Sequence, residues 1–173
     1  MLLYYFSKCI GIHILRTLRE GKVLSIIYRI DKEKRITLAV WDGAVTEEKL
    51  LAHLRKLLAD PDWPGKRRLH LSDLRTTSAY LNIDEISIKK VLAFLGKFPN
   101  KIANVKMAMV AHEAYQMSNI FQRLISKYPL TVIAFNSLDT ACTWLDIDAD
   151  ESECALQQLR AKAREGTDTQ GQT

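Results

Sequence analysis

The chain has 173 residues, of which 47% are hydrophobic and 26% are charged, values close to the average for soluble globular proteins. This composition excludes a disordered chain and a bundle of membrane helices, and the length suits one domain with extensions at its ends. The net charge is +5, and the basic excess lies in the first 68 residues. We therefore predict residues 22–147 as the folded domain, with residues 1–21 and 148–173 as extensions.

Cysteines and basic clusters give no sign of a disulfide framework, a zinc site or a nucleic-acid interface. Cys9, Cys142 and Cys154 are odd in number and form no CxxC pair, as expected for a protein of a reducing cytoplasm. The basic clusters at residues 32–35 and 66–68 contain no interleaved aromatic residues. Short basic turns are usually solvated surface, so nucleic acid is not an expected partner.

The first twenty residues begin with an apolar run and are then interrupted by charges. Residues 1–6 are apolar, but Lys8, Arg16 and Arg19 follow, so no uncharged run is long enough to cross a bilayer. The segment also has no small-residue cleavage site of the kind that ends a secretory signal. Two interpretations stay open: a helical extension that packs on the domain or on a partner, which we favour, and a helix that lies on a membrane surface.

From residue 22 the pattern predicts a hairpin and then a helix. Two β-rich runs, residues 23–30 and 35–41, flank a short polar turn, which is typical of an antiparallel hairpin at the edge of a sheet. Thr46 is a suitable N-cap, and Glu47 and Glu48 place acidic groups in the first turn of the following helix. Leucines at helical spacing give this helix one apolar face: Leu50, Leu51, Leu54, Leu57 and Leu58.

The next segments alternate between strand and helix patterns. We predict strands at residues 68–74, 105–111 and 130–135, and helices at residues 82–98, 113–128 and 137–145. Asn82 and Glu85 have the spacing of a capping box, and Gln122 lies on the predicted outer face of its helix. A further charged helix at residues 151–164 precedes a tail that is predicted to be disordered from Gly166.

These elements predict an α/β fold with one mostly parallel β-sheet, an N-terminal antiparallel hairpin and helices on both faces. Continuous apolar strands that alternate with helices indicate parallel strands, because only a crossover helix returns the chain to the start of a parallel strand. Ligands of such sheets bind beyond the carboxyl ends of the strands. The candidate binding or regulatory residues are therefore Asp73, Arg75, Thr76, Thr77 and Ser78 after one strand, and His112 and Tyr115 after its neighbour.

No residue pattern indicates catalysis, a metal or a cofactor. The histidines, His13, His53, His70 and His112, share no metal-binding spacing, and the glycines form neither a dinucleotide-binding nor a Walker motif. Cys142 lies on the core face of its helix, where inert packing is the expected role. Trp63 has two interpretations, an exposed anchor for a partner or a side chain folded over an adjacent helix.

The order of elements resembles that of the SpoIIAA-like proteins, which belong with the STAS domains. The strand end Asp73-Leu74-Arg75 and the helix end Ala141-x-x-Trp144-Leu145 carry this resemblance, which covers about residues 22–147. The broad architecture is also similar to the lipid-binding CRAL-TRIO/SEC14 domains. STAS antagonists act through a phosphorylatable serine in an Asp-Ser pair; Thr77 and Ser78 lie nearby without that pair. We expect their hydroxyls to bond to backbone groups of the loop.

The resemblance implies a non-catalytic interaction or regulatory module with a protein partner in the bacterial cytoplasm. The alternative is a carrier of a lipid or another apolar ligand at the membrane periphery, motivated by the SEC14 similarity, the apolar N-terminus and the basic front. A filled core between the sheet and the helices at 82–98 and 113–128 would favour the module, whereas an open cavity there would favour the carrier. An enzyme would require polar side chains that converge with perturbed protonation in one pocket. The oligomeric state is left open.

Overall fold

The computed structural model describes residues 25–43, 45–63, 68–76, 84–112 and 115–168. The N-terminal segment, Thr77 and Ser78 lie outside these ranges. The described elements, in chain order, are β1 (Ser25–Asp31), β2 (Ile36–Asp42), α2 (Glu47–Ala59), β3 (Arg68–Asp73), α3 (Glu85–Leu95), α4 (Pro99–Ile102), β4 (Val105–Val110), α5 (Tyr115–Ile125), β5 (Leu130–Phe135), α6 (Leu138–Leu145) and α7 (Ala149–Asp168).

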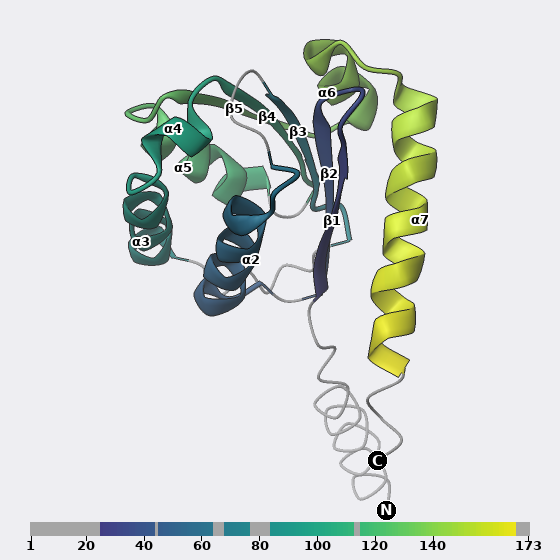
Figure 1. The fold of residues 1–173 in the computed structure, drawn as a ribbon, viewed down its shortest axis with the longest axis horizontal. Helices are drawn as coiled ribbons and strands as arrows, with labels where there is room; N and C mark the ends of the chain where they lie inside the picture. Colours follow the sequence, from purple (N-terminus) through teal and green to yellow (C-terminus); the bar gives the residue numbers. More distant parts are fainter. Residues whose placement is uncertain (1–24, 44, 64–67, 77–83, 113–114, 169–173) are drawn as a thin grey trace, which may run out of the picture.

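The centre of the molecule is a five-stranded sheet in the order β1-β2-β3-β4-β5 (Figure 1). Strands β1 and β2 pair antiparallel, and the pairs β2–β3, β3–β4 and β4–β5 are parallel. Strand β1 lies at the edge of the sheet, as the hairpin pattern predicted. The predicted fold class, a mostly parallel sheet with an N-terminal antiparallel hairpin and helices on both faces, is confirmed.

Helices cover the sheet on two faces, and each face has its own hydrophobic core (Figure 1). Helices α2, α3 and α5 cover one face, where Leu57, Val91 and Ile125 are buried. Helices α6 and α7 cover the other face, where Ala141 and Leu156 are buried. Because side chains of a strand alternate between faces, β2 and β4 contribute to both cores, which explains their nearly continuous apolar sequences. Strand β3 contributes apolar side chains to the second core only.

Helix α2 agrees with its predicted caps, whereas α3 begins and ends elsewhere than predicted. The Thr46 hydroxyl accepts a hydrogen bond from the Lys49 N–H at 3.3 Å. In α3 the N-cap is Asp84, whose carboxylate accepts from the Ser87 N–H at 2.7 Å, so the capping box predicted from Asn82 is wrong. Asp is as good an N-cap as Asn, and Asp84 directly precedes the first helical residue.

The predicted continuation of this helix to residue 98 is also wrong. Helix α3 ends at Leu95, and Pro99 opens the short helix α4, because proline fits the first position of a helix better than its interior. Phe98 precedes α4 and is 36% exposed, so it does not continue the buried stripe of α3.

Helix α5 is shorter than predicted, and one of its residues has a different role. The described part of the helix is Tyr115–Ile125, so it ends at Ile125 rather than at residue 128; residues 113–114 lie outside the described ranges. Gln122 was predicted to face outwards, but its side-chain oxygen accepts a hydrogen bond from the Ala134 N–H at 2.9 Å. Ala134 lies in β5, the second edge strand of the sheet. The amide therefore satisfies a backbone donor that has no neighbouring strand.

Helix α7 packs along β1 and β2 as part of the second core (Figure 1). Leu156 has no exposed surface, and Ala155 and Leu159 are also buried. The disorder predicted from Gly166 is wrong for residues 166–168, because the helix continues to Asp168. One glycine costs a helix only about 1 kcal/mol, which a helix of this length tolerates. Within the described residues, no helix is both long and apolar enough to cross a membrane.

Candidate functional site

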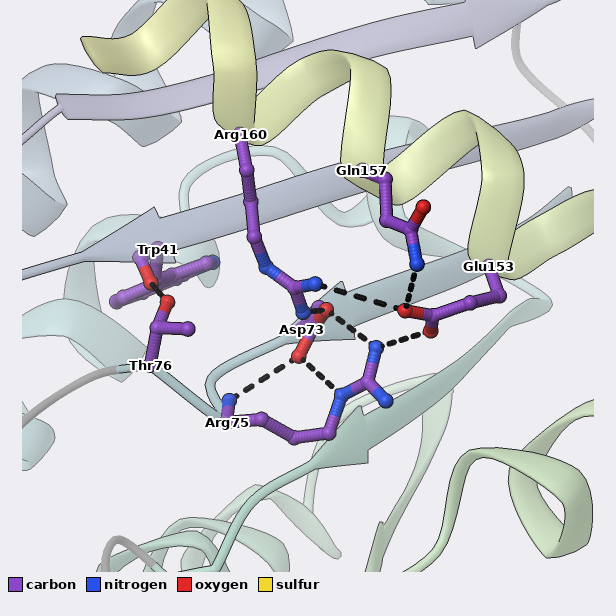
Figure 2. Close-up of polar contacts among 7 residues, drawn as sticks. All are labelled: Trp41, Asp73, Arg75, Thr76, Glu153, Gln157 and Arg160. Atoms are coloured by element: carbon purple, nitrogen blue, oxygen red, sulfur yellow. Dashed lines mark hydrogen bonds and ion pairs between the residues drawn. The ribbon is translucent and has the colours of Figure 1, made fainter.

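The predicted strand tip is a network of ion pairs between β3 and α7 (Figure 2). The Asp73 carboxylate has no exposed surface, and Arg75 donates to it from Nε at 3.0 Å and from a terminal nitrogen at 3.0 Å. Arg160 of α7 also pairs with Asp73. Glu153 of α7 accepts from Arg75 at 2.5 Å and from the Gln157 amide at 3.0 Å.

This network joins two carboxylates and two guanidinium groups, so their charges balance. Burial alone would raise the pKa of Glu153, but hydrogen bonds from Arg75 and Gln157 hold that pKa below its usual value. Asp73 and Arg75 were predicted from the sequence, whereas Glu153 and Arg160 were not. Glu153 lies 78 residues after Arg75, and Arg160 lies 87 residues after Asp73. The acidic and basic residues of α7 were the only signal, and a charged helix is normally solvated.

The other predicted site residues are spread around this network. The Thr76 hydroxyl donates to the Trp41 carbonyl oxygen at 3.1 Å. Asp73 is paired with Val110 across β3 and β4, so the ends of these strands lie side by side, as predicted. His112 is exposed beyond the end of β4. Tyr115 is the first residue of α5, and its side chain lies outside the described part of the structure. A binding or regulatory role for these residues stays a prediction.

An apolar cavity of about 110 Å³ lies between the sheet and helices α2, α3 and α5. From the sequence alone, it was open whether the core at this position is filled or contains a cavity. Each of the three helices and the facing strands contribute to its wall, which is almost entirely hydrocarbon. The apolar lining includes Leu50, Leu57, Val91, Met107, Met109 and Phe121.

Three polar side chains, His53, His70 and Ser72, interrupt this apolar lining. His70 Nε2 and Ser72 Oγ are hydrogen-bonded at 2.9 Å. Burial lowers the pKa of His70 to about 3 and that of His53 to about 4, with smaller contributions from the neighbouring His53 and Lys56 respectively. Both imidazoles are therefore neutral near pH 7.

The His70–Ser72 pair resembles a nucleophile with its base, but its electrostatics do not suit that chemistry. A general base works best when its pKa lies near the working pH, and the pKa of His70 is far below it. In the described ranges, no group of three or more His, Cys, Asp or Glu residues is arranged to hold a metal ion.

Trp63 and Arg68 form a stacked pair on the same face of the sheet. Trp63 is buried, and its indole N–H donates to the Lys101 carbonyl oxygen at 3.4 Å, so the interpretation as an exposed anchor is wrong. The Arg68 guanidinium lies 4.6 Å from the centre of the Trp63 ring. Its three nitrogens are buried and have no hydrogen-bond partner in the part of the chain that the structure describes. Burial, and then the charge of Arg35, lower the pKa of Arg68.

A second hollow, of about 300 Å³, lies between the hairpin β1–β2 and the start of α7. Charged side chains of both signs line it, including Arg29, Asp31 and Asp148. Lys34 and Glu151 form an ion pair across it, and their side chains are 50% and 63% exposed, respectively. Although its volume is larger, charged side chains line it, and no described residue of this lining has a buried side-chain atom without a hydrogen-bond partner.

Comparisons with known proteins give a similarity to a solved structure but no match to a family model or a curated protein. The sequence matches no protein-family model and no curated protein. Among solved structures, the chain is similar to an uncharacterised protein of the DUF3478 family with a SpoIIAA-like fold from Shewanella loihica PV-4. The TM-score is 0.45 and the identity 14%, over 70% of this chain and 93% of that chain. The fold of this chain rests on its own strand order and strand directions, which are those of a mostly parallel sheet with one antiparallel edge strand.

Proposed function

We propose that this protein is a non-catalytic binding module for a small apolar molecule, which it holds between the sheet and helices α2, α3 and α5. The observation that carries this proposal is the apolar cavity of about 110 Å³. Protein interiors are packed as densely as organic crystals, and voids that could hold a small molecule are few in a domain of this size. A void also costs stability through lost contacts, which a ligand restores.

The volume restricts the size of the ligand. An engineered apolar cavity of about 150 Å³ stays dry and binds benzene or xenon. The cavity of about 110 Å³ is somewhat smaller, so it suits a ligand no larger than about a single six-membered ring. Sites for drug-sized ligands are larger, at about 300–1,000 Å³. The cavity therefore favours a small ring over a lipid chain. Met107 and Met109 in the wall have flexible side chains that adapt to the shape of such a ligand.

The role as a protein-interaction module at the strand tip is less well supported by the geometry. The Asp73 carboxylate is buried, and Arg75, Arg160 and Glu153 already satisfy one another's charges. A partner that recognised the Asp73 carboxylate would first have to displace the guanidinium groups of Arg75 and Arg160. Recovery of a partner from lysate that depends on Asp73 and Arg75, tested with a double alanine variant, is the measurement that would restore this interpretation.

Toluene binding to the full-length protein tests the proposed function. We expect saturable binding by titration calorimetry with Kd on the order of 0.1–1 mM, and a rise in Tm because only the folded state binds. Val91 lines the cavity and is buried, so Val91→Phe should fill part of the space and abolish binding. A folded wild-type protein that shows no saturable toluene binding would contradict the proposal.

Val110 provides a matched control for the filling variant. It is also a buried valine, but it lies in the other core and outside the lining of the cavity. Val110→Phe should leave toluene affinity unchanged in the protein that remains folded, although overpacking costs about 1–3 kcal/mol. Equal loss of binding in both variants would mean that general destabilisation, rather than filled space, removed the ligand.

A further inference from the structure

Strand β1 has an open edge on the side away from β2. It pairs with β2 along its whole length without a bulge, and no other described strand pairs with it. The Arg35 carbonyl oxygen accepts from the Leu69 N–H of β3 at 3.2 Å, and the direction of the backbone groups alternates along β2. Every second residue of β2 therefore bonds to β3, and the others bond to β1. In the register of the hairpin, this leaves the backbone groups of Ile26, Tyr28 and Ile30 facing the open edge.

This edge has the properties of a pairing surface. Edge strands that stay single are usually very short, bulged or interrupted by proline, whereas β1 is a regular strand of 7 residues with no proline. The side chains of Ile26, Ile27, Tyr28 and Ile30 are half-buried, so they keep apolar surface at the rims of both cores. A second strand would bury this surface and bond to the outward backbone groups.

A second copy of β1, placed antiparallel, satisfies the edge along its length. With a two-fold axis at Tyr28, Ile26 lies opposite Ile30 of the second copy, and Tyr28 lies opposite its own copy. All of these residues have outward backbone groups, so they exchange about six hydrogen bonds. Like apolar side chains meet on one face, which favours cross-strand packing. Such a contact is isologous and closes as a dimer.

The same arrangement brings helix α7 next to its copy. Helix α7 packs over β1 and β2, close to the open edge (Figure 1). Neighbouring strands lie about 4.8 Å apart, so helices centred over β1 and β2 of each copy are separated by about 10 Å. Two helices pack at about this distance. The dimer is therefore joined through the sheet and through one helix layer.

Charged residues of α7 match across this pair of helices. Glu153 and Arg160 lie on the side of α7 that faces the end of β3. Glu151 and Lys162 are each two residues away from one of them, about 200° around the helix axis, so they face the open edge. Both side chains are exposed. In an antiparallel helix pair centred between them, Glu151 of each copy lies opposite Lys162 of the other copy.

The centre of the helix pair coincides with the centre of the strand pair. Ala155 of α7 and Arg29 of β1 line the same hollow, and Arg29 is next to Tyr28. The midpoint between Glu151 and Lys162 is less than one helical turn from Ala155, so one two-fold axis serves both contacts. We infer that the protein forms a two-fold dimer in which β1 pairs with β1 of a second copy and α7 packs antiparallel on its copy. This inference does not depend on the proposed function.

Sedimentation equilibrium of the full-length protein tests this dimer. At about 100 µM chain we expect a mass of about twice 19.8 kDa, with a dimer Kd on the order of 10 µM. Lys162→Glu should raise this Kd about tenfold, because the two-fold axis replaces two attractive charge pairs by two repulsive ones. Adding Glu151→Lys should reverse most of that loss. Lys127→Glu makes the same charge change at an exposed site between α5 and β5, the strand at the other edge of the sheet, and should leave the Kd unchanged.

Amide hydrogen exchange of the wild-type protein locates the interface without relying on variants. The amides of Ile26, Tyr28 and Ile30 should exchange slowly at dimer concentrations and faster after dilution to the monomer. A monomer at about 100 µM, a dimer that Lys162→Glu does not weaken, or a dimer whose formation leaves exchange at these amides unchanged would each overturn the inference. Slow exchange of these amides in a monomer would overturn it too, because residues 1–24 of the same chain would then cover the edge.

Discussion

The two buried histidines should make the protein lose stability between about pH 6.5 and pH 3. The pKa of His53 lies at about 4 and that of His70 at about 3, both below the ordinary value of 6.5. As the pH falls below about 6.5, the unfolded chain binds protons at these groups while the folded protein does not. The contribution of the neutral histidines to stability is therefore fully present above that pH. It decreases as the pH falls and stops changing below the folded pKa values.

The size of this effect at about pH 5 does not depend on the folded pKa values, provided that they lie below 5. Between about pH 6.5 and pH 5, a range of about one and a half pH units, each histidine lowers the free energy of unfolding by roughly 1.4 kcal/mol per unit. The loss for each histidine is therefore about 2 kcal/mol. Both rings are neutral in the folded state at that pH, so repulsion between them does not enter. Two histidines together remove about 4 kcal/mol, a large part of the stability of a typical domain.

Urea unfolding at about pH 7.5 and at about pH 5 measures this loss. His53→Phe should lose about 2 kcal/mol less than wild type between the two conditions. Carboxylates also titrate on acidification, but they are common to both proteins and cancel in the comparison. His112→Gln is the control, because the exposed side chain is solvated in both states. An identical loss in wild type and His53→Phe would refute the argument that His53 is buried and neutral.

Five further substitutions, in three tests, probe the packing and the buried charges. Arg68→Met should raise the free energy of unfolding by about 1 kcal/mol in urea titration, because it removes a buried cation without a hydrogen-bond partner in the described residues; a large loss would mean that Arg68 binds an anion in solution. Asp73→Asn should lower the free energy of unfolding by about 3 kcal/mol in the same titration, since it leaves two guanidinium groups beside a neutral side chain. Arg160→Ala should lower it less, because Asp73 keeps its ion pair with Arg75. Equal losses in the two variants would contradict the central place of Asp73 in the network. Val91→Phe should lower Tm less than Val110→Phe, because only the first enters free space, and the reverse order in calorimetry would argue against a cavity.

The fold could be predicted from the sequence because its signals are local. The polar turn between two β-rich runs identified the hairpin, Thr46 identified the start of α2, and the apolar run at residues 130–135 coincides with β5. Cys142 was predicted to lie in the core, and it is buried there. Where a competing local signal existed, the prediction failed: Asp84, two residues after Asn82, is the actual cap of α3.

The sequence indicated where a cavity could lie, but neither its presence nor the polar side chains in its wall could be predicted, because both depend on contacts between distant segments. His53 and His70 come from a helix and a strand, and no spacing rule relates them. A cavity is a defect in packing, and sequence patterns specify which side chains are inside but not how well their volumes fit. The ion pairs of Asp73 were hidden for a similar reason, since α7 had the pattern of a solvated helix until its position over β1 and β2 was known.

The hydrogen bond between Gln122 and Ala134 bears on how copies of this protein behave in concentrated solution. A parallel strand at the edge of a sheet presents backbone donors and acceptors to which another chain can add itself. The Gln122 amide occupies the Ala134 N–H of β5 and stands where an incoming strand would have to bond. Removing this side chain would free a backbone donor at the β5 edge of the sheet, so Gln122 blocks one position at which another strand could pair.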